Sequence, residues 1–425
     1  MEKSPEELYR EREKRVNDAI QLKVPDRIPF FPFTHFFAVK YTGMTFEEAF
    51  YDPDKFLAAN KKMNMDLEPD LYFPPVFVLN TPGQVLEALD VRVFKWPGHG
   101  VSPYHTHQFV EGEYIKADEY DTLLKDPSDF LMRTILPRVC GALESFRTLP
   151  PLRSFRFSYL GIFLNYAVYG MPEVGNAFPE AAGAFESVLK AGREMMKWGT
   201  SALAFDQEMR ALGFPALAGG FTGAPFDLFS FVRGMRGSML DMYRQPDKLL
   251  EVMERMLPRV IWAGVTTAKM SGNPRVFMGL HRGTDSFMST KQFETFYWPT
   301  LKRLTLALID EGLIPFLGWE EKCDQRLEYL TELPKGKVIC FFAGKTDVFK
   351  AKEILGNNIC IAGNMPISLL QTGTPQQVKD YAKRLIDVVG KDGGFIMCCS
   401  SVMDEADPEL VKVWADFTKE YGVYR

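Results

Sequence analysis

The chain has 425 residues, of which 46% are hydrophobic and 25% are charged, and its formal net charge is -5. Acidic residues outnumber basic ones, no long run of Lys and Arg occurs, and the charged N-terminal stretch lacks the apolar segment of a signal peptide. Together with six cysteines that do not form a secreted disulfide framework, these features predict a globular cytoplasmic protein without nucleic-acid or membrane partners.

The first half of the chain predicts two strands and a long insertion. An amphipathic helix occupies residues 1–25, and the strand 28–33 ends at Thr34 and His35. A helix that begins at Asp52, with Pro53 in its first turn, precedes a second strand at 70–76. Residues 85–114 alternate and are rich in turn residues, which predicts a β-hairpin, whereas 117–212 are mostly helical. We therefore expect residues 85–212 to be a hairpin and helical insertion.

The second half alternates regularly between strands and helices. Capping boxes begin helices at Ser289 and Thr374. Short apolar runs predict strands at 215–221, 275–280, 313–318, 337–343, 358–363 and 395–400. With the two strands of the first half, the count reaches the eight that a closed barrel needs. The sequence predicts one (β/α)8 TIM barrel across residues 1–425, with N-terminal helices and an inserted helical region.

Polar and ionisable residues follow the predicted strands. In TIM barrels the active site lies on the loops at the carboxyl ends of the strands. The candidates at these exits are His35, His281, Asp285, Glu320, Asp347 and Asn364. Such convergence favours an enzyme over a barrel that only binds a tetrapyrrole, a corrinoid or a protein. Aromatic residues also cluster near the exits and are either core or pocket lining, namely Phe31, Phe33, Phe36, Phe37, Tyr72, Phe73, Phe77 and Trp319.

Several segments resemble the uroporphyrinogen decarboxylase superfamily. They are VNDAIQLKVPDRIPF (16–30), ADEYDTLLKDP (117–127), SFMSTKQFETFYWPTLKRL (286–304), IAGNMPISLLQTGTPQQVKDYAKRLI (361–386) and DEADPEL (404–410). The resemblance covers most of the chain and is weakest between 131 and 212. It implies a single barrel and one of two activities: cofactor-free decarboxylation of tetrapyrrole acetate arms, or methyl transfer to or from a corrinoid on another protein with the help of zinc.

The loop after the first predicted strand distinguishes the two branches. Decarboxylases of the superfamily carry an arginine-rich motif there, whereas this chain has Pro-Phe-Thr-His-Phe-Phe at 32–37. A substrate with many carboxylates requires bidentate guanidinium partners. The chain is therefore more similar to the corrinoid-dependent methyltransferase branch, which implies a small methyl donor and a corrinoid protein as partner. His35, Phe36, Phe37, Phe73, Trp319 and Asn364 are the expected substrate-binding residues.

The metal ligands of that branch are altered in this chain. Where a His-x-Cys motif is expected, the sequence reads Gly318-Trp319-Glu320, and Cys398, Cys399, Ser400 and Ser401 lie across the final ligand position. The resemblance then implies one of two outcomes. Either the zinc site is rebuilt from Glu320 and Cys399 with His281 or Cys323 as third ligand. Or the zinc site is lost, and Glu320 orients the substrate or acts as an acid or base. Glu320, His281, Asp285 and Asp347 are the expected catalytic residues.

Other readings of the same residues remain open. Glu320 and Glu321 also suit the N-terminus of a helix, and His281 could serve only to hydrogen-bond its loop. His99, His105 and His107 fit no standard zinc spacing, and we expect a structural or substrate-facing loop. Cys340 and Cys360 are expected in the core, and alternation along the strand allows only one of Cys398 and Cys399 to be a ligand.

Overall fold

A computed structural model describes residues 3–149 and 178–424. Residues 150–177, in the middle of the predicted helical insertion, lie outside the described part. Six parallel strands form a sheet in the order β4-β5-β6-β7-β8-β9. Their bounds are β4 Gly220–Phe221, β5 Arg275–Leu280, β6 Ile314–Trp319, β7 Ile339–Phe342, β8 Cys360–Ala362 and β9 Phe395–Ile396.

Two further segments close this sheet into a barrel. Phe30 pairs in parallel with Met397 just after β9, and the Phe31 N–H donates to the Met397 carbonyl at 2.9 Å. The Asp70 N–H donates to the Phe30 carbonyl at 2.8 Å, and Tyr72 pairs in parallel with Ala216 ahead of β4. The ring thereby reaches the eight strands that the sequence predicts, and the fold is a (β/α) barrel.

The closing segments form only short ladders because prolines interrupt them. Pro29, Pro32 and Pro74 have no N–H to donate, so a continuous ladder is impossible at these positions. The predicted second strand is accordingly shorter than 70–76, because α5, Pro75–Val78, begins within it.

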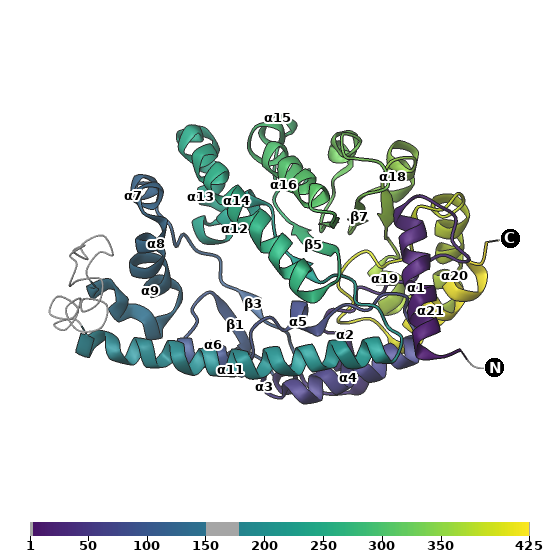
Figure 1. The fold of residues 1–425 in the computed structure, drawn as a ribbon, viewed down its shortest axis with the longest axis horizontal. Helices are drawn as coiled ribbons and strands as arrows, with labels where there is room; N and C mark the ends of the chain where they lie inside the picture. The colour runs from purple at the N-terminus through teal and green to yellow at the C-terminus, as the bar shows by residue number, and fades with distance from the viewer. Residues whose placement is uncertain (1–2, 150–177, 425) are drawn as a thin grey trace.

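Helices follow the strands along the chain and surround the barrel (Figure 1). Figure 1 shows α14 and α16 side by side and the long α11 along the lower edge of the molecule. The bounds of the surrounding helices are α1 Pro5–Ile20, α2 Phe37–Thr42, α3 Phe46–Tyr51, α4 Pro53–Leu67, α12 Pro225–Arg233, α13 Met235–Arg244, α14 Pro246–Ser271, α15 Thr290–Gln292, α16 Trp298–Asp310, α17 Leu327–Leu330, α18 Val348–Leu355, α19 Ile367–Thr372, α20 Pro375–Arg384 and α21 Pro408–Tyr421.

The helix starts predicted from sequence are confirmed. Asp52 accepts from the Lys55 N–H, and both Ser289 and Thr374 form complete capping boxes. These contacts satisfy N–H groups that the first turn of a helix leaves unpaired. None of the helices in the described ranges combines the length and apolar character that crossing a membrane requires.

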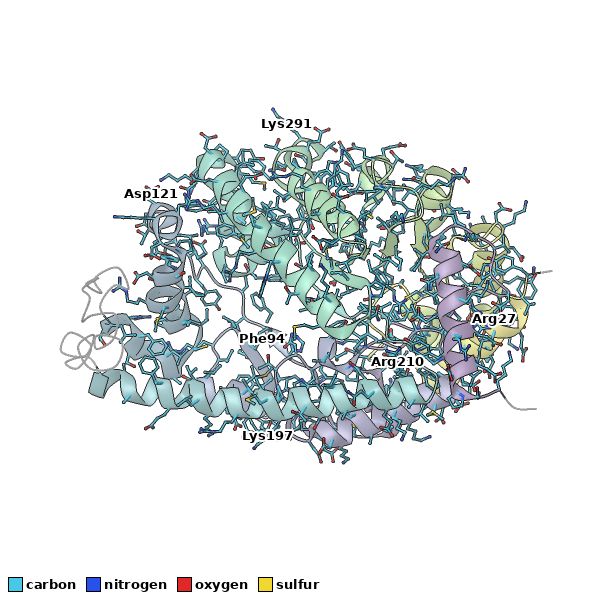
Figure 2. The ribbon with its side chains drawn as sticks, viewed as in Figure 1. Arg27, Phe94, Asp121, Lys197, Arg210 and Lys291 are labelled. Atoms are coloured by element: carbon cyan, nitrogen blue, oxygen red, sulfur yellow. The ribbon has the colours of Figure 1, made fainter. Side chains whose placement is uncertain are left out.

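A small sheet and several helices lie between the second and third barrel strands. The sheet has the order β2-β1-β3 (β1 Phe94–Pro97, β2 Gly100–Val101, β3 Gln108–Phe109), and β1 and β3 are antiparallel, as in a hairpin. Phe94 lies between α11 and the barrel helices (Figure 2). The helices of this region are α6 Gly83–Leu89, α7 Tyr120–Lys125, α8 Pro127–Phe130, α9 Leu136–Val139, the 3-10 helix Gly141–Thr148 and α11 Phe178–Ala211.

Candidate functional site at the barrel mouth

The interior of the barrel contains a layer of phenylalanine rings. Phe33 contacts Phe73 at 4.7 Å and Phe341 at 5.4 Å between ring centroids, and Phe277 contacts Phe316 at 5.5 Å. These rings come from the two closing segments and from β5, β6 and β7, so they fill the barrel from several sides. We call Phe33, Phe73, Phe277, Phe316 and Phe341 the phenylalanine layer. It provides an apolar, aromatic surface beneath the carboxyl ends of the strands.

His281 and Glu320 lie above this layer as a hydrogen-bonded pair. Side chains alternate along a strand, so His281 shares a face with Phe277, and Glu320 shares a face with Phe316. The His281 Nδ1 lies 3.0 Å from the Glu320 Oε2, and the two side chains are 32% and 41% exposed. Two of the predicted catalytic residues, from neighbouring strand exits, therefore meet at the mouth of the barrel.

The surroundings of His281 favour its protonated form. Burial lowers the pKa of His281, but the hydrogen bond and charge of Glu320, together with the charge of Asp227, outweigh this effect and the pKa is raised. The nearby charge of Arg282 opposes the increase only in part. A protonated imidazole can donate a proton to a leaving group in the mouth.

Asp227 on α12 holds the exit of β5 in place. Its buried carboxylate accepts from the N–H groups of His281 and Arg282 at 3.2 and 2.7 Å and from the Tyr297 hydroxyl at 2.6 Å. Burial raises the pKa of Asp227. The sequence analysis missed this residue; the available signal was one acid within the otherwise apolar segment 214–232.

Glycine at position 279 leaves the space that the pair occupies. A Cβ at Gly279 would lie 3.0 Å from the Glu320 Oε1 and 3.3 Å from the His281 Nε2. Gly279→Ala is therefore expected to displace the pair and lower turnover about 10-fold or more, because small misplacements of catalytic groups are costly. Steady-state kinetics with a thermal unfolding curve would test this, and unchanged turnover in a folded variant would contradict it.

A second pair, from the first closing segment and the chain after β9, lies on the opposite side of the mouth. The His35 Nδ1 lies 3.1 and 3.0 Å from the two Asp404 oxygens, and the Phe36 N–H donates to Asp404 at 2.7 Å. Asp404 and His107 line a cavity of about 580 Å³. Burial, followed by the charge of His35, lowers the pKa of His107. Asp404 thus holds His35 near the mouth, and substrate binding by His35 stays a prediction.

The loop histidines do not gather as a metal site. The His99 Nε2 donates to the Glu87 carboxylate at 2.8 Å and its ring stacks on Trp96, whereas His105 and His107 line the 580 Å³ cavity. Within residues 3–149 and 178–424, no three His, Cys, Asp or Glu side chains form a group able to hold a metal.

The predicted zinc ligands are not brought together. Glu320 and His281 meet, but the Cys399 thiol donates to the Ser401 carbonyl at 3.2 Å, and the buried Cys323 thiol lies 3.5 Å from the Thr346 hydroxyl. Burial raises the pKa of Cys323, which disfavours the thiolate that zinc requires. This donor set does not fit a three-ligand zinc centre.

Three aromatic residues predicted to bind substrate lie elsewhere. Trp319 is fully buried on the helix-facing side of β6, where its ring lies 6.3 Å from Phe293 and 6.4 Å from Tyr297. Phe36 and Phe37 are also fully buried, and Phe36 packs against rings of α3 and α4. Trp319 lies there because a strand places alternate side chains on opposite faces, and Phe36 and Phe37 lie at the start of α2, which follows the first strand. Phe73, in contrast, belongs to the phenylalanine layer.

The remaining predicted residues hold the loops. Asp347 is the N-cap of α18 and accepts from the N–H groups of Phe349 and Lys350. Asp285 accepts from the Gln325 N–H at 3.1 Å and lies 3.6 Å from the Arg326 Nε. The Asn364 amide donates to the Thr346 carbonyl at 3.0 Å. These contacts give Asp347 and Asp285 structural partners, and their predicted catalytic role stays a prediction.

Comparison with known proteins agrees with the fold and with the resemblance in sequence. The family model for uroporphyrinogen decarboxylase (URO-D) matches residues 187–421. Similar curated proteins are the uroporphyrinogen decarboxylases of Chlorobium phaeovibrioides, 25% identical over 47% of this chain, and of Chlorobium luteolum, 24% identical over 47%. The chain spans 59% of the length of each.

A solved structure with the same fold is a methyltransferase from Methanosarcina mazei. It superimposes with a TM-score of 0.60 at 13% identity and covers 96% of this chain and 98% of that protein. This likeness concerns the fold, since the identity is low. Because the URO-D model matches more than half of the chain, this protein belongs to the uroporphyrinogen decarboxylase family, and its barrel fold agrees with that membership.

Proposed function

We propose that the protein is a methyltransferase that moves a methyl group from a small methyl ether, such as a methoxylated aromatic compound, to a corrinoid carried by a partner protein. The family membership and the methyltransferase of the same fold support this choice. The observation that carries the proposal is the His281–Glu320 pair above the phenylalanine layer. An aromatic ring would lie on the layer and place its ether oxygen near His281.

The chemistry assigned to the pair is proton donation to the leaving oxygen. The corrinoid supplies the nucleophile that attacks the methyl carbon. As that bond forms, the carbon–oxygen bond breaks and its electron pair passes to the ether oxygen. Protonated His281 donates a proton to this oxygen, and Glu320 orients the imidazole and stabilises its charge. The products are the methylated acceptor and a phenol or alcohol.

Two arginines near the mouth have partners of their own, which argues against uroporphyrinogen as the substrate. Arg233 pairs with Asp241, and the buried Arg326 lies 3.6 Å from Asp285, so neither guanidinium is free for a substrate. A substrate with many carboxylates would need several free guanidinium groups at the mouth. Because the donor set of the mouth does not fit zinc, the proposed step uses no metal.

A panel of donors tests the proposal. The protein would be incubated with a reduced corrinoid protein and with methoxylated aromatics, methanol, methylamines or methyl thioethers, and methylation of the corrinoid would be followed spectroscopically. We expect transfer from the methoxylated aromatics. Turnover of uroporphyrinogen at an enzyme-like rate, or no transfer from any methyl ether, would contradict the proposal.

The rate should fall at high pH. The pKa of His281 is raised, so His281 is fully protonated below the ordinary histidine pKa of about 6.5. It loses its proton, and with it the role of donor, as the pH rises through its higher pKa in the folded protein. The stability that the pair contributes follows the same direction. A pH profile of the single-turnover rate measures this, and a rate that rises across the same range would assign His281 the role of a base.

A further inference from the structure

Arg282, directly after His281, carries its guanidinium over two aromatic rings, those of Phe231 and Phe287. The guanidinium carbon lies 5.7 Å from the centre of the Phe231 ring and 5.2 Å from that of Phe287. The Phe231 ring also lies 5.4 Å from the His281 ring, so the two residues share one aromatic neighbour. Such cation–π contacts leave the N–H groups of the guanidinium available for other partners.

This edge lacks a strong acceptor. The Arg282 Nε donates to the Ser230 hydroxyl at 3.2 Å, and Nη1 lies 3.6 Å from the Met235 sulfur, which is a weak acceptor. No carboxylate within residues 3–149 and 178–424 forms an ion pair with it, whereas Arg233 and Arg326 have Asp241 and Asp285. Even so, the charge of Arg282 lies close enough to lower the pKa of His281.

We propose that Arg282 binds one oxyanion of the methyl donor, a carboxylate, and so selects anionic methoxylated aromatics. This inference rests on the proposed function. A guanidinium forms bidentate hydrogen bonds with a carboxylate, and one free arginine matches a donor with one such group. Because Phe231 contacts both the Arg282 guanidinium and the His281 ring, a methoxybenzoate with its carboxylate on Arg282 would lie beside the His281–Glu320 pair.

Direct binding of matched ligands tests the proposal without any methyl transfer. Calorimetric titration of the purified protein with para-methoxybenzoate and para-methoxybenzamide compares two ligands of nearly the same size and shape, in which a neutral amide replaces the carboxylate. Wild-type protein should bind the acid about 10- to 100-fold more tightly than the amide, the range expected for a hydrogen-bonded charged group. Arg282→Gln should lose this preference by weakening the acid alone, and Arg282→Lys should recover part of it.

Arg384→Gln is the matched control. Arg384 also stacks on a ring, 4.0 Å from the centre of Phe349, but it lies in the outer helices, and its loss should leave both affinities unchanged. Equal binding of acid and amide by wild-type protein would overturn the proposal, as would an equal loss of both ligands in Arg282→Gln.

The corrinoid is the other source of an oxyanion, through its phosphate. If Arg282→Gln weakens binding of free cobalamin and leaves methoxybenzoate unchanged, the anion belongs to the corrinoid and the proposal is wrong. Binding is measured without methyl transfer, so the two proposals can fail separately. If the protein prefers the acid through Arg282 but transfers no methyl group, the proposed function is wrong and the anion site at Arg282 still stands.

Discussion

Glu320→Gln is expected to lower methyl transfer by about 100-fold or more while the protein remains folded. The carboxylate raises the pKa of His281 through a hydrogen bond and a charge, and the neutral amide removes the charge. A smaller fraction of His281 would then be protonated, and a general acid contributes on the order of 100- to 10,000-fold. Single-turnover methylation of the corrinoid protein measures the rate, and NMR titration of the His281 ring should show a lower pKa in the variant.

Glu321→Gln provides the control for this experiment. Glu321 is the next residue in the chain and is exposed, so its loss should change neither the rate nor the His281 titration. A full rate in Glu320→Gln would contradict the assignment. Metal analysis of both proteins separates the alternatives: stoichiometric zinc that disappears in Glu320→Gln would make Glu320 a metal ligand, as the family resemblance implies.

Asp70→Ala is expected to destabilise the protein by about 3–5 kcal/mol. Asp70 is fully buried and accepts from Arg27 at 2.8 and 2.9 Å, from the Phe30 N–H at 2.8 Å, and from Arg15 on α1. Its removal would leave the side chain of Arg15 buried without this partner and loosen the seam where the barrel closes. Figure 2 labels Arg27 at the end of the molecule that contains α1 and α21. The midpoint of urea unfolding measures the effect.

Asp26→Ala is the matched control at the same arginine. Asp26 also pairs with Arg15, but its side chain is 63% exposed, and exposed pairs contribute only about 0–1 kcal/mol. If Asp70→Ala shifts the urea midpoint no more than Asp26→Ala does, and the slope of the unfolding free energy against urea is unchanged, the buried Asp70 network does not stabilise the closing strands.

The sequence by itself determined the strands and most helix starts. Apolar runs of strand length, such as 275–280, and capping boxes such as the one at Ser289 depend on neighbours along the chain, so their signals are local. Closure of the barrel ring, in contrast, depends on contacts between residues that are distant in the chain. Phe30 pairs with Met397, far away in the chain, and prolines break the ladder there, so the closing contacts depend on the assembled barrel and on the buried carboxylate of Asp70.

For the site, position at a strand exit identified His281 and Glu320, because every strand of a barrel ends at the same rim. Which exit residues face inward was decided by the tertiary structure. Glu320 faces the mouth and its neighbour Trp319 faces the helices, a difference of one residue in an alternating strand. Asp227 on α12 accepts from the exit of β5 and from Tyr297, and Arg282 contacts α12 and the loop before α15. These partners are distant in the chain, so the sequence alone does not show which of these charges has a partner.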